Sequence, residues 1–285
     1  MNTPELKKIG VAYHPHIAEA VATAQSVESF LLEQGAESVL CCSLKDPQLE
    51  EAITSHSIDA LTVLGGDGSM LRASQLCAPA GVPITGINLG TFGFLFELER
   101  HNWQNHLAHL MQGKYRIEKR MMLQASHYRS NELLGTWQVV NEIVVCRGQQ
   151  VKPIRMHASV DEYPMASYVA DGLIAATATG STAYALAVNG PIMPPETRNI
   201  LVVPVAPHLS FDRAVILNEG SYVTITVDTN YDTVFSADGH EPVKMMNHDS
   251  VKISASNMDV HFIRFHNAGF FYRNLNRYMK QNPTV

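Results

Sequence analysis

The residues that first point to chemistry form a glycine-rich turn, Gly65-Gly66-Asp67-Gly68-Ser69. The apolar run before it, Ile58–Leu64, predicts a strand, and the run after it, Met70–Ala78, predicts a helix. Glycines in such a turn let backbone N–H groups point at a phosphate, and the helix offers its positive N-terminal end to the same anion. A carboxylate in this place suits removal of a proton from a hydroxyl, or help in holding a metal ion.

Plainer interpretations of this turn stay open on the residues alone. Asp67 is a good candidate to cap the following helix. Arg72, about one helical turn inside that helix, can reach a phosphate or pair with a surface carboxylate. The turn is not a P-loop, because no Gly-Lys-Ser/Thr follows, and its spacing differs from the dinucleotide fingerprint Gly-x-Gly-x-x-Gly.

A second group of polar residues, Asn141-Glu142, lies inside an apolar segment, Val139–Val145. Neighbouring residues of a strand face opposite ways, so one of the pair is expected to point to the buried side unless a bulge intervenes. Burial of a polar group without a partner costs a few kcal/mol, so a partner is expected. Backbone amides and ligand hydroxyls both suit that role.

The longest polar constellation runs from Asp171 to Tyr184 and contains a hydroxyl-rich turn. A strand is expected to end near Ala176, and a helix is expected from about Ser181 through Asn189. Thr179 and Thr182 then supply donors and acceptors at a helix N-terminus, and small residues such as Ala183 and Ala187 let a flat ring approach. A helix cap with a small-residue packing face explains the same pattern, and Asp171 before a glycine is equally a turn residue.

Strand and helix patterns alternate along the first third of the chain. Strands are expected at Lys8–Tyr13, Val39–Cys42, Ile58–Leu64 and Val82–Asn88, and helices at Ile17–Gln34, Met70–Ala78 and His101–Met111. This rhythm predicts a doubly wound, Rossmann-like α/β domain over residues 1–115, with a parallel sheet. Both glycine loops, the second being Leu89–Leu95, follow strands at the edge where such sheets bind ligands.

After about Lys114 the pattern changes to period-two segments. Strands are expected at Gly135–Cys146, Arg155–Val160, Tyr163–Val169, Asn199–Val205, Ser221–Val227, Thr233–Ser236, Ser250–Ala255 and Val260–Phe265. We expect an antiparallel, β-sandwich-like domain over residues 116–267. The tail, Phe270–Lys280, is expected as a helix or an extended arm, with about 268–285 returning to the first domain.

Composition excludes several classes of protein. The 285 residues are 46% hydrophobic and 17% charged, with a net charge of −6, which argues against a dedicated nucleic-acid or anionic-membrane binder. The 4 cysteines form no Cys-x-x-Cys pair and suit buried positions in a reducing cell. No apolar stretch approaches a membrane span and no signal-like core follows the N-terminus, so a cytoplasmic protein is expected. The 13 histidines lack metal-ligand spacing, so no structural metal site is expected, and a lone His240 at a hairpin turn is usually solvated.

Taken together, these stretches closely resemble the NAD kinase family. That family carries a Gly-Gly-Asp-Gly loop, an Asn-Glu pair in its β domain and an Asp-Gly-Leu…Thr-Gly-Ser-Thr-Ala-Tyr run, and all three occur here in that order. The segment Asn88–Leu95 is similar to the family's second glycine loop. The resemblance spans residues 9 to about 270, and the joint match is much more specific than any single motif.

The resemblance implies transfer of the γ-phosphate of ATP to the 2′-hydroxyl of the adenosine ribose of NAD, giving NADP and ADP. Asp67 would accept the hydroxyl proton or orient the hydroxyl, with Gly66 and Gly68 near the phosphates and Arg72 among the nucleotide-binding residues. Magnesium, or another divalent cation, is expected with ATP, held largely by phosphates and water.

The resemblance also implies contacts to NAD along the rest of the chain. Asn141 and Glu142 would bind ribose hydroxyls, and Asp171 would lie near the nicotinamide end. The other implied contacts are Thr182, Ala183 and Tyr184 in the adenine and ribose region, Phe94 as an apolar wall, and Thr179, Lys152 and His240 as further binding residues. Ala187 is carried over only as shape, because the family usually has a serine there. A homodimer or homotetramer is implied as well.

The sequence departs from the family pattern at a few positions. Ser69 replaces the usual threonine and keeps a hydroxyl, and Asn189 stands where glycine is common. These changes bear on affinity and regulation rather than on the reaction. A lipid kinase with the same glycine loop would leave Asn141-Glu142 and the run from Thr179 to Tyr184 unexplained. A non-catalytic dinucleotide sensor would be favoured by an altered Asp67, which is intact.

Overall fold

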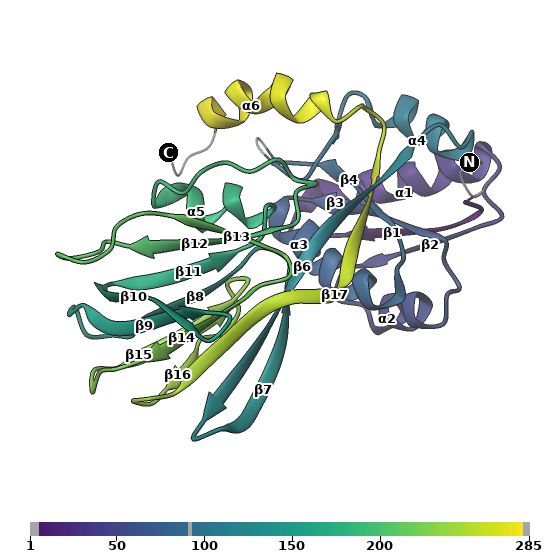
Figure 1. Cartoon of the computed structure of the whole chain (residues 1–285). Coiled ribbons are helices and arrows are strands. Elements are labelled where there is room, and N and C mark those ends of the chain that lie inside the picture. Colours follow the sequence, from purple (N-terminus) through teal and green to yellow (C-terminus); the bar gives the residue numbers. More distant parts are fainter. Residues whose placement is uncertain (1–5, 91–92, 282–285) are drawn as a thin grey trace. The chain divides into compact units, whose positions relative to one another are not determined.

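The chain divides into two compact units in a computed structural model that describes residues 6–90 and 93–281. Unit 1 comprises the residues up to Lys119 and those from Val260 onward, and unit 2 comprises Arg120–Asp259 (Figure 1). The sequence placed the divisions near residues 115 and 268. The structure places them inside two long strands, β6 (Arg116–Arg129) and β17 (Ser250–Arg264).

Unit 1 alternates strands and helices, as the hydrophobic periodicity predicted. In chain order its elements are β1 (Lys8–Tyr13), α1 (Ala18–Glu33), β2 (Ser38–Ser43), α2 (Pro47–Thr54), β3 (Ala60–Gly65), α3 (Asp67–Cys77), a 3₁₀ turn (Ala78–Ala80), β4 (Ile84–Asn88), β5 (Leu98–Glu99), α4 (Trp103–Met111) and, after β17, α6 (Gly269–Gln281). The tail is therefore a helix rather than an extended arm.

The sheet of unit 1 is parallel, with strands in the order β2-β1-β3-β4. Strand order reverses between β1 and β3, so the carboxyl ends of these strands form the switch point at which doubly wound sheets bind ligands. The end of β17 adds to β4 in parallel, with Phe262 opposite Ile84. α1 and α4 cover one face of this sheet and α2 and α3 the other (Figure 1).

Unit 2 is built from antiparallel strands. Besides the remaining parts of β6 and β17, its elements are β7 (Glu132–Val139), β8 (Glu142–Arg147), β9 (Ile154–Val160), β10 (Tyr163–Ala170), β11 (Gly172–Ala176), a 3₁₀ turn (Gly180–Thr182), α5 (Tyr184–Ala187), β12 (Asn199–Val205), β13 (Val215–Asn218), β14 (Tyr222–Val227), β15 (Thr233–Ala237) and β16 (Val243–Met245). The hairpin expected at Asp161-Glu162 is confirmed, and both residues have the positive φ angles of a tight turn.

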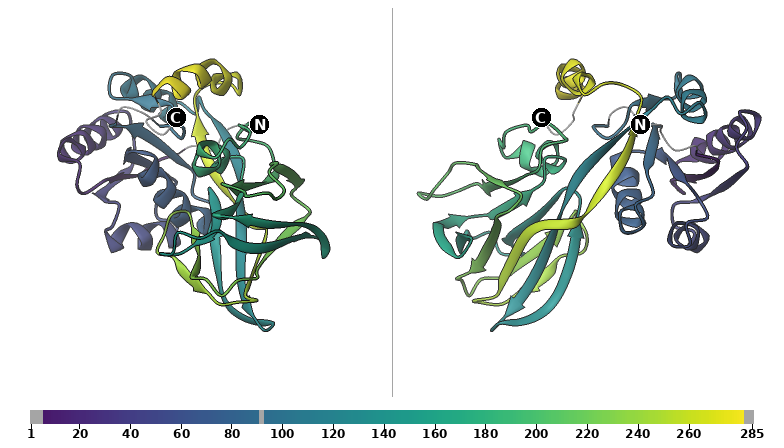
Figure 2. Two further views of the ribbon diagram at one scale, coloured as in Figure 1. Left: turned by 90° about the vertical axis from the view of Figure 1, so that its left-hand side faces the viewer. Right: turned by 45° about the vertical axis from the view of Figure 1, so that its right-hand side comes forward.

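Two sheets pack face to face in unit 2, which confirms the sandwich. One sheet has the order β10-β9-β14-β17, with β6 paired to β17 and to β7, and the other has the order β13-β12-β11-β8-β15-β16. Figure 2 shows the long strands β6 and β17 running side by side. Alternate apolar residues of both sheets meet in one core, and Phe235 at its centre contacts Trp137 edge-to-face at 4.9 Å.

Besides the strand expected at Gly135–Cys146, which is divided between β7 and β8, two predictions about the elements of unit 2 are wrong. The strands expected at Ser250–Ala255 and Val260–Phe265 are one strand, β17. The polar residues between them do not break it, because Ser256 donates to Gln138 at 2.7 Å and accepts from Met258 N–H. The helix expected from Ser181 to Asn189 is a 3₁₀ turn and a four-residue α5, since hydroxyls there bind nearby backbone carbonyls instead of extending a helix.

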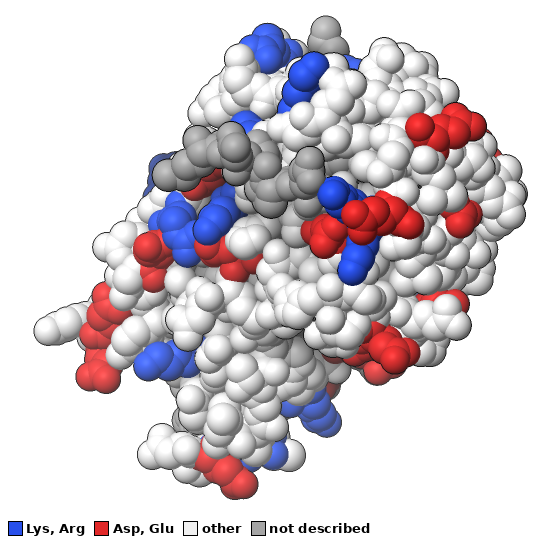
Figure 3. Space-filling view, turned by 90° about the vertical axis from the view of Figure 1, so that its right-hand side faces the viewer, with Lys and Arg blue, Asp and Glu red and all other residues white. Residues whose placement is uncertain are grey.

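Charges on the surface carry both signs. On the face drawn in Figure 3, Lys and Arg side chains alternate with Asp and Glu side chains, in keeping with a net charge of only −6. Within the described ranges, no helix has both the length and the apolar content that crossing a membrane requires.

A buried carboxylate ties the ends of two strands in unit 2. Asp249, fully buried, accepts hydrogen bonds from His127 at 3.0 Å, from the Arg129 guanidinium at 2.8 and 2.9 Å, and from Met246 N–H at 2.8 Å. Burial by itself raises the pKa of this carboxyl, but the bonds from Arg129, Met246 N–H and His127 outweigh it, and the pKa is lowered. The charged form is therefore the one that the fold stabilises.

Asp249→Asn is expected to lower the free energy of unfolding by about 1–3 kcal/mol at pH 7, because it weakens the bonds to buried His127 and to the partly exposed Arg129. A lowered folded-state pKa contributes stability above the unfolded value of about 3.9 and loses it as the pH falls through the folded value. The gap between wild type and variant should therefore narrow below about pH 4. Urea unfolding at pH 7 and pH 3 measures this, and an equal gap at both would contradict the role of Asp249.

Candidate active site

Asp67 lies just after β3, as the first residue of α3, with Gly66 in the N-cap position. Its carboxylate accepts two hydrogen bonds from the second glycine loop: Phe94 N–H donates to Oδ2 at 3.0 Å, and Leu95 N–H donates to Oδ1 at 3.2 Å. The interpretation of Asp67 as a helix cap is therefore wrong. The start of α3 and two loop amides together hold the carboxylate in one orientation, at the edge of the sheet where ligands bind.

A pocket of about 400 Å³ opens at the same edge of unit 1. It is formed by residues that follow β1, β2 and β3, namely His14, Pro15, Ile17, Leu44, Lys45, Gly66, Gly68, Ser69 and Arg72. The pocket lies at the switch point between β1 and β3, where the crevice is left open by the reversal of strand order.

The lining of this pocket suits an anion. His14, Lys45 and Arg72 carry basic side chains, and the Arg72 Nε donates to the Leu44 carbonyl at 3.2 Å, which holds the guanidinium beside the end of β2. Among the ion pairs of the described residues, Arg72 has none, so the surface pairing considered from the sequence is not formed. A Cβ added at Gly66 or Gly68 would meet no heavy atom within 4 Å, so the fold itself leaves this space open.

The second glycine loop approaches Asp67 through its backbone. A Cβ at Gly93 would lie 2.9 Å from the Asp67 Oδ1, so glycine is needed there for the close approach. Phe94 is itself buried, and its expected role as an apolar wall for NAD stays a prediction. Thr91 and Phe92 of this loop lie outside the described residues.

In unit 2, Asn141 and Glu142 do not lie in one continuous strand. β7 ends at Val139 and β8 begins at Glu142, and the two strands belong to different sheets. The turn between them is held by Asp238, whose carboxylate accepts from Val140 N–H at 2.8 Å, Asn141 N–H at 2.7 Å and Glu142 N–H at 3.1 Å. Three backbone donors that leave the sheets at this point are thereby satisfied by one side chain.

The same turn interlocks with the hydroxyl-rich segment that follows β11. Thr177 donates through its hydroxyl to the Val140 carbonyl at 2.7 Å, and its N–H donates to the Asn141 carbonyl at 2.8 Å. Gly180 packs directly on the turn, since a Cβ there would lie 2.1 Å from the Asn141 carbonyl oxygen. The structure thus brings the Asn141-Glu142 turn into contact with the hydroxyl-rich run from Asp171 to Tyr184.

Two polar atoms in this cluster lack a partner. Glu142 Oε2 and Thr179 Oγ1 are buried, and among the described residues neither has a hydrogen-bond partner. Burial raises the pKa of the Glu142 carboxyl to about 8, with a contribution from Asp238, and the Tyr184 backbone N–H opposes this rise. Buried polar atoms are normally hydrogen-bonded, so these atoms are suited to receive a polar ligand such as a sugar diol.

The other predicted residues of unit 2 are more exposed. Partial burial raises the pKa of the half-exposed Tyr184, Cys146 and Asp171 raise it further, and Arg147 opposes this rise. Asp171 also pairs with Arg147 at 3.1 Å. Thr182 donates to the Thr179 carbonyl, Ala183 joins the 3₁₀ turn to α5, and Ala187, at the end of α5, is exposed. Lys152 lies 5.1 Å from the Tyr231 ring centroid, and His240 is exposed at the turn between β15 and β16.

Sequence reasoning missed Asp238 and Thr177, which position Asn141 and Glu142. The only available signal was the turn Ala237-Asp238-Gly239, from which His240 was selected instead. Asp238 is 98 residues from Val140 along the chain, a contact that local patterns do not reveal.

Gly180→Ala is expected to destabilise unit 2 by about 1–3 kcal/mol, because the new Cβ overlaps the Asn141 carbonyl and must displace the turn. Thermal unfolding measures the loss. Gly68→Ala is the matched control, since its Cβ meets nothing within 4 Å. Equal stability of the two variants would show that the turn does not depend on close packing at Gly180.

Comparison with known families adds an independent finding. The family model of the ATP-NAD kinase N-terminal domain matches residues 46–115, and that of the ATP-NAD kinase C-terminal domain matches residues 140–265. Solved structures with the same fold include a yeast NADH kinase complexed with NADH, with a TM-score of 0.82 at 21% identity over 99% of this chain and 90% of that chain. An NAD kinase from Archaeoglobus fulgidus in complex with ATP has a TM-score of 0.75 at 24% identity, covering 96% of this chain and 99% of that chain.

Similarity to NAD kinase sequences extends over nearly the whole chain. An NAD kinase of Caldanaerobacter subterraneus subsp. tengcongensis is 33% identical over 274 residues, which cover 93% of this chain and 96% of that protein. An NAD kinase of Heliobacterium modesticaldum is 36% identical over 226 residues, 79% of each chain. With this identity across nearly its full length, and with both domains matched, the chain belongs to the NAD kinase family.

Proposed function

We propose that Asp67 accepts, or orients, the proton of the 2′-hydroxyl of the adenosine ribose of NAD while the γ-phosphate of ATP is transferred to that oxygen. The reaction itself, ATP-dependent phosphorylation of NAD, follows from membership of the family. The position of the Asp67 carboxylate supports this role. Two loop amides fix the carboxylate at the switch-point edge of the sheet. A carboxylate held in this way is a suitable group to accept or orient a hydroxyl proton.

The basic pocket of unit 1 is proposed to hold the phosphates of ATP. Phosphoryl transfer depends mainly on positioning and on stabilising charge, and this pocket combines the N-terminus of α3 with His14, Lys45 and Arg72. The empty space at Gly66 and Gly68 lets phosphate oxygens approach the backbone N–H groups directly. Arg72 therefore serves the donor in this proposal.

The interlocked turns of unit 2 are proposed to bind ribose hydroxyls of NAD. With a pKa of about 8, Glu142 is mostly protonated at pH 7, so it can donate one hydrogen bond and accept others. The unpartnered Thr179 hydroxyl offers a further donor and acceptor. Asn141, Asp171, Thr182, Ala183 and Tyr184 are proposed to complete the dinucleotide contacts from the same segments.

A divalent cation, expected to be magnesium, is proposed to bind through a single carboxylate of the protein together with groups of the substrate. Across residues 6–90 and 93–281, no three His, Cys, Asp or Glu side chains are grouped to hold a metal ion. Magnesium often binds through one carboxylate together with substrate phosphates and water, and Asp67, whose neighbours Gly66 and Gly68 line the pocket, is proposed as that carboxylate. When bound, the ion would neutralise phosphate charge.

Several features stay predictions from the family resemblance. These are assembly into a homodimer or homotetramer, and contacts of NAD with Phe94, Lys152, Ala187 and His240. A cytoplasmic location stays a prediction from the sequence pattern.

The proposal for Asp67 predicts that Asp67→Asn lowers kcat by at least ~100-fold, the low end for loss of a general base, with little change in NAD affinity. The purified chain is incubated with ATP, magnesium and NAD, and NADP is measured with an NADP-specific dehydrogenase. NAD affinity is measured separately by calorimetry. If the variant changed only the affinity for NAD, Asp67 would be a binding residue.

Gly68→Ala is expected to separate stability from activity. Alanine inside the first turn of α3 should leave stability unchanged or raise it by about 0.5–1 kcal/mol, because glycine is the poorer helix former. The methyl group would occupy space proposed for phosphate, so KM for ATP should rise about tenfold or more, while NAD affinity stays constant. An unchanged KM for ATP would show that ATP does not bind in this pocket.

A further inference from the structure

We propose that Arg264 and Glu118 are positioning residues for phosphoryl transfer, which act on Asp67 through the backbone of a single residue, Leu95. This inference rests on the proposed role of Asp67. All of the residues involved belong to unit 1.

Leu95 connects Asp67 to a buried ion pair. Its N–H donates to the Asp67 Oδ1 at 3.2 Å, and its carbonyl accepts from the Arg264 Nη1 at 2.9 Å. The Arg264 Nε in turn donates to the Glu118 Oε1 at 3.1 Å. Arg264 is 4% exposed and Glu118 is 5% exposed, so water does not replace either partner easily.

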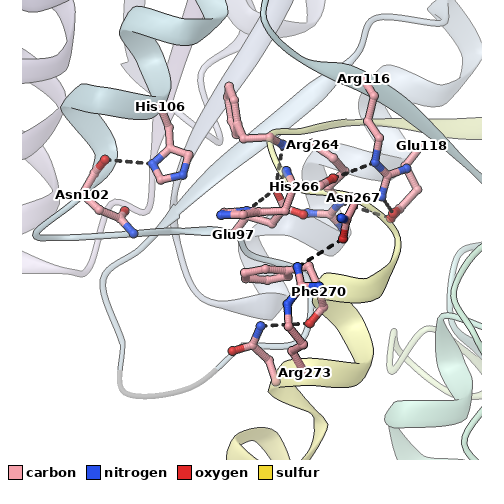
Figure 4. Close-up of polar contacts among 12 residues, drawn as sticks. Glu97, Asn102, His106, Arg116, Glu118, Arg264, His266, Asn267, Phe270 and Arg273 are labelled. Carbon is pink, nitrogen blue, oxygen red and sulfur yellow. Dashed lines mark hydrogen bonds and ion pairs between the residues drawn. The ribbon is translucent and has the colours of Figure 1, made fainter.

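The ion pair is itself held from several sides (Figure 4). The second oxygen of Glu118 accepts from Arg116 at 2.8 Å, and the Arg116 Nε donates to the His266 carbonyl at 2.8 Å. The Arg264 guanidinium also lies 4.6 Å from the Phe262 ring. Each group in this cluster therefore restricts the orientation of the next.

The segment after Leu95 is anchored to the same strand end. Glu97, itself buried, accepts from Phe265 N–H at 2.7 Å and from His266 N–H at 3.3 Å. The loop that holds Asp67 is thus tied to the end of β17 at both Leu95 and Glu97. A shift of β17 or loss of Arg264 would be transmitted to the amides that orient the Asp67 carboxylate.

A buried ion pair is a poor device for stability alone, because desolvation offsets much of its attraction. It is well suited to fixing the Leu95 carbonyl, since the planar Arg264 guanidinium binds Glu118 and this carbonyl at the same time. A misplacement of about 1 Å at a reacting group can lower the rate about 100-fold. The geometry therefore links Arg264 to rate rather than to substrate affinity.

The test uses Arg264→Lys in the full chain. Lysine keeps a positive charge beside Glu118 but lacks the fork that also reaches the Leu95 carbonyl. We expect kcat to fall about 10–100-fold and KM for ATP and NAD to change less than about threefold. Arg129→Lys is the matched control: it alters the guanidinium on buried Asp249 in unit 2, so it should lower thermal stability with kcat unchanged.

Two further measurements distinguish a specific effect on the Asp67 carboxylate from a general loss of stability of the protein. Hydrogen exchange followed by NMR should show faster exchange at Leu95 and Phe94 in Arg264→Lys, with exchange in unit 2 unchanged. In an Asp67→Asn background, Arg264→Lys should lower the residual kcat by less than about twofold, because the residue through which it acts is already lost. Glu118→Gln serves as a second variant if Arg264→Lys does not fold.

The outcomes are distinct. Unchanged exchange at Leu95, or a normal kcat despite faster exchange, overturns the role of Arg264. Fully additive effects with Asp67→Asn overturn it as well. A wild-type chain without NAD kinase activity would refute the proposed function, whereas the exchange measurement would still decide whether Arg264 holds the loop.

Discussion

Aspartate carboxylates that accept backbone N–H groups of irregular turns are the interaction on which both units depend. Where a chain leaves a sheet its N–H groups lose their ladder partners, and a buried donor without a partner costs about 1–3 kcal/mol. In unit 1, Asp67 accepts from the loop at Phe94 and Leu95, and in unit 2, Asp238 accepts from three successive residues at Val140–Glu142. The turns that carry the candidate site are ordered because charged acceptors, which bind N–H groups more strongly than neutral ones, lie at their centres.

The two aspartates differ in their surroundings. Asp238 has three backbone donors and is buried, so it acts as a fixed support that brings Glu142 to its place. Asp67 lies beside a glycine loop whose free space the fold does not fill. One carboxylate therefore supports a turn of unit 2 and the other lies in the glycine loop of unit 1, although both are held by the same kind of bond. The raised pKa of Glu142 follows from this arrangement, because its burial near Asp238 disfavours a second negative charge.

Local patterns identified much of the fold. The 3.6-residue periodicity located α1, and period-two segments located most strands of unit 2, because each element buries one face. The predictions of individual elements were wrong where hydrogen bonds to residues distant in the sequence, or from side chains to the backbone, determined the local structure. Ser256 did not interrupt β17, because Gln138 satisfies its hydroxyl, and Val139–Val145 did not stay one strand, because Asp238 stabilises a break within it. The helix expected after Gly180 was shortened by hydroxyl groups that bind the backbone.

The sequence by itself determined the glycine loop with its carboxylate, the Asn141-Glu142 pair and the hydroxyl-rich run, since residue type and spacing along the chain encode such motifs directly. It also determined the family, because the joint order of the motifs is specific. Only the tertiary structure decided that Asp67 binds the second loop instead of capping its helix, and that Thr177, Gly180 and Asp238 hold the turn at residues 140–142. It alone joined Arg264 to Leu95, 169 residues apart in the chain. Such contacts depend on which backbone groups the packed strands leave unpaired, and this is set by the completed sheets rather than by any local segment.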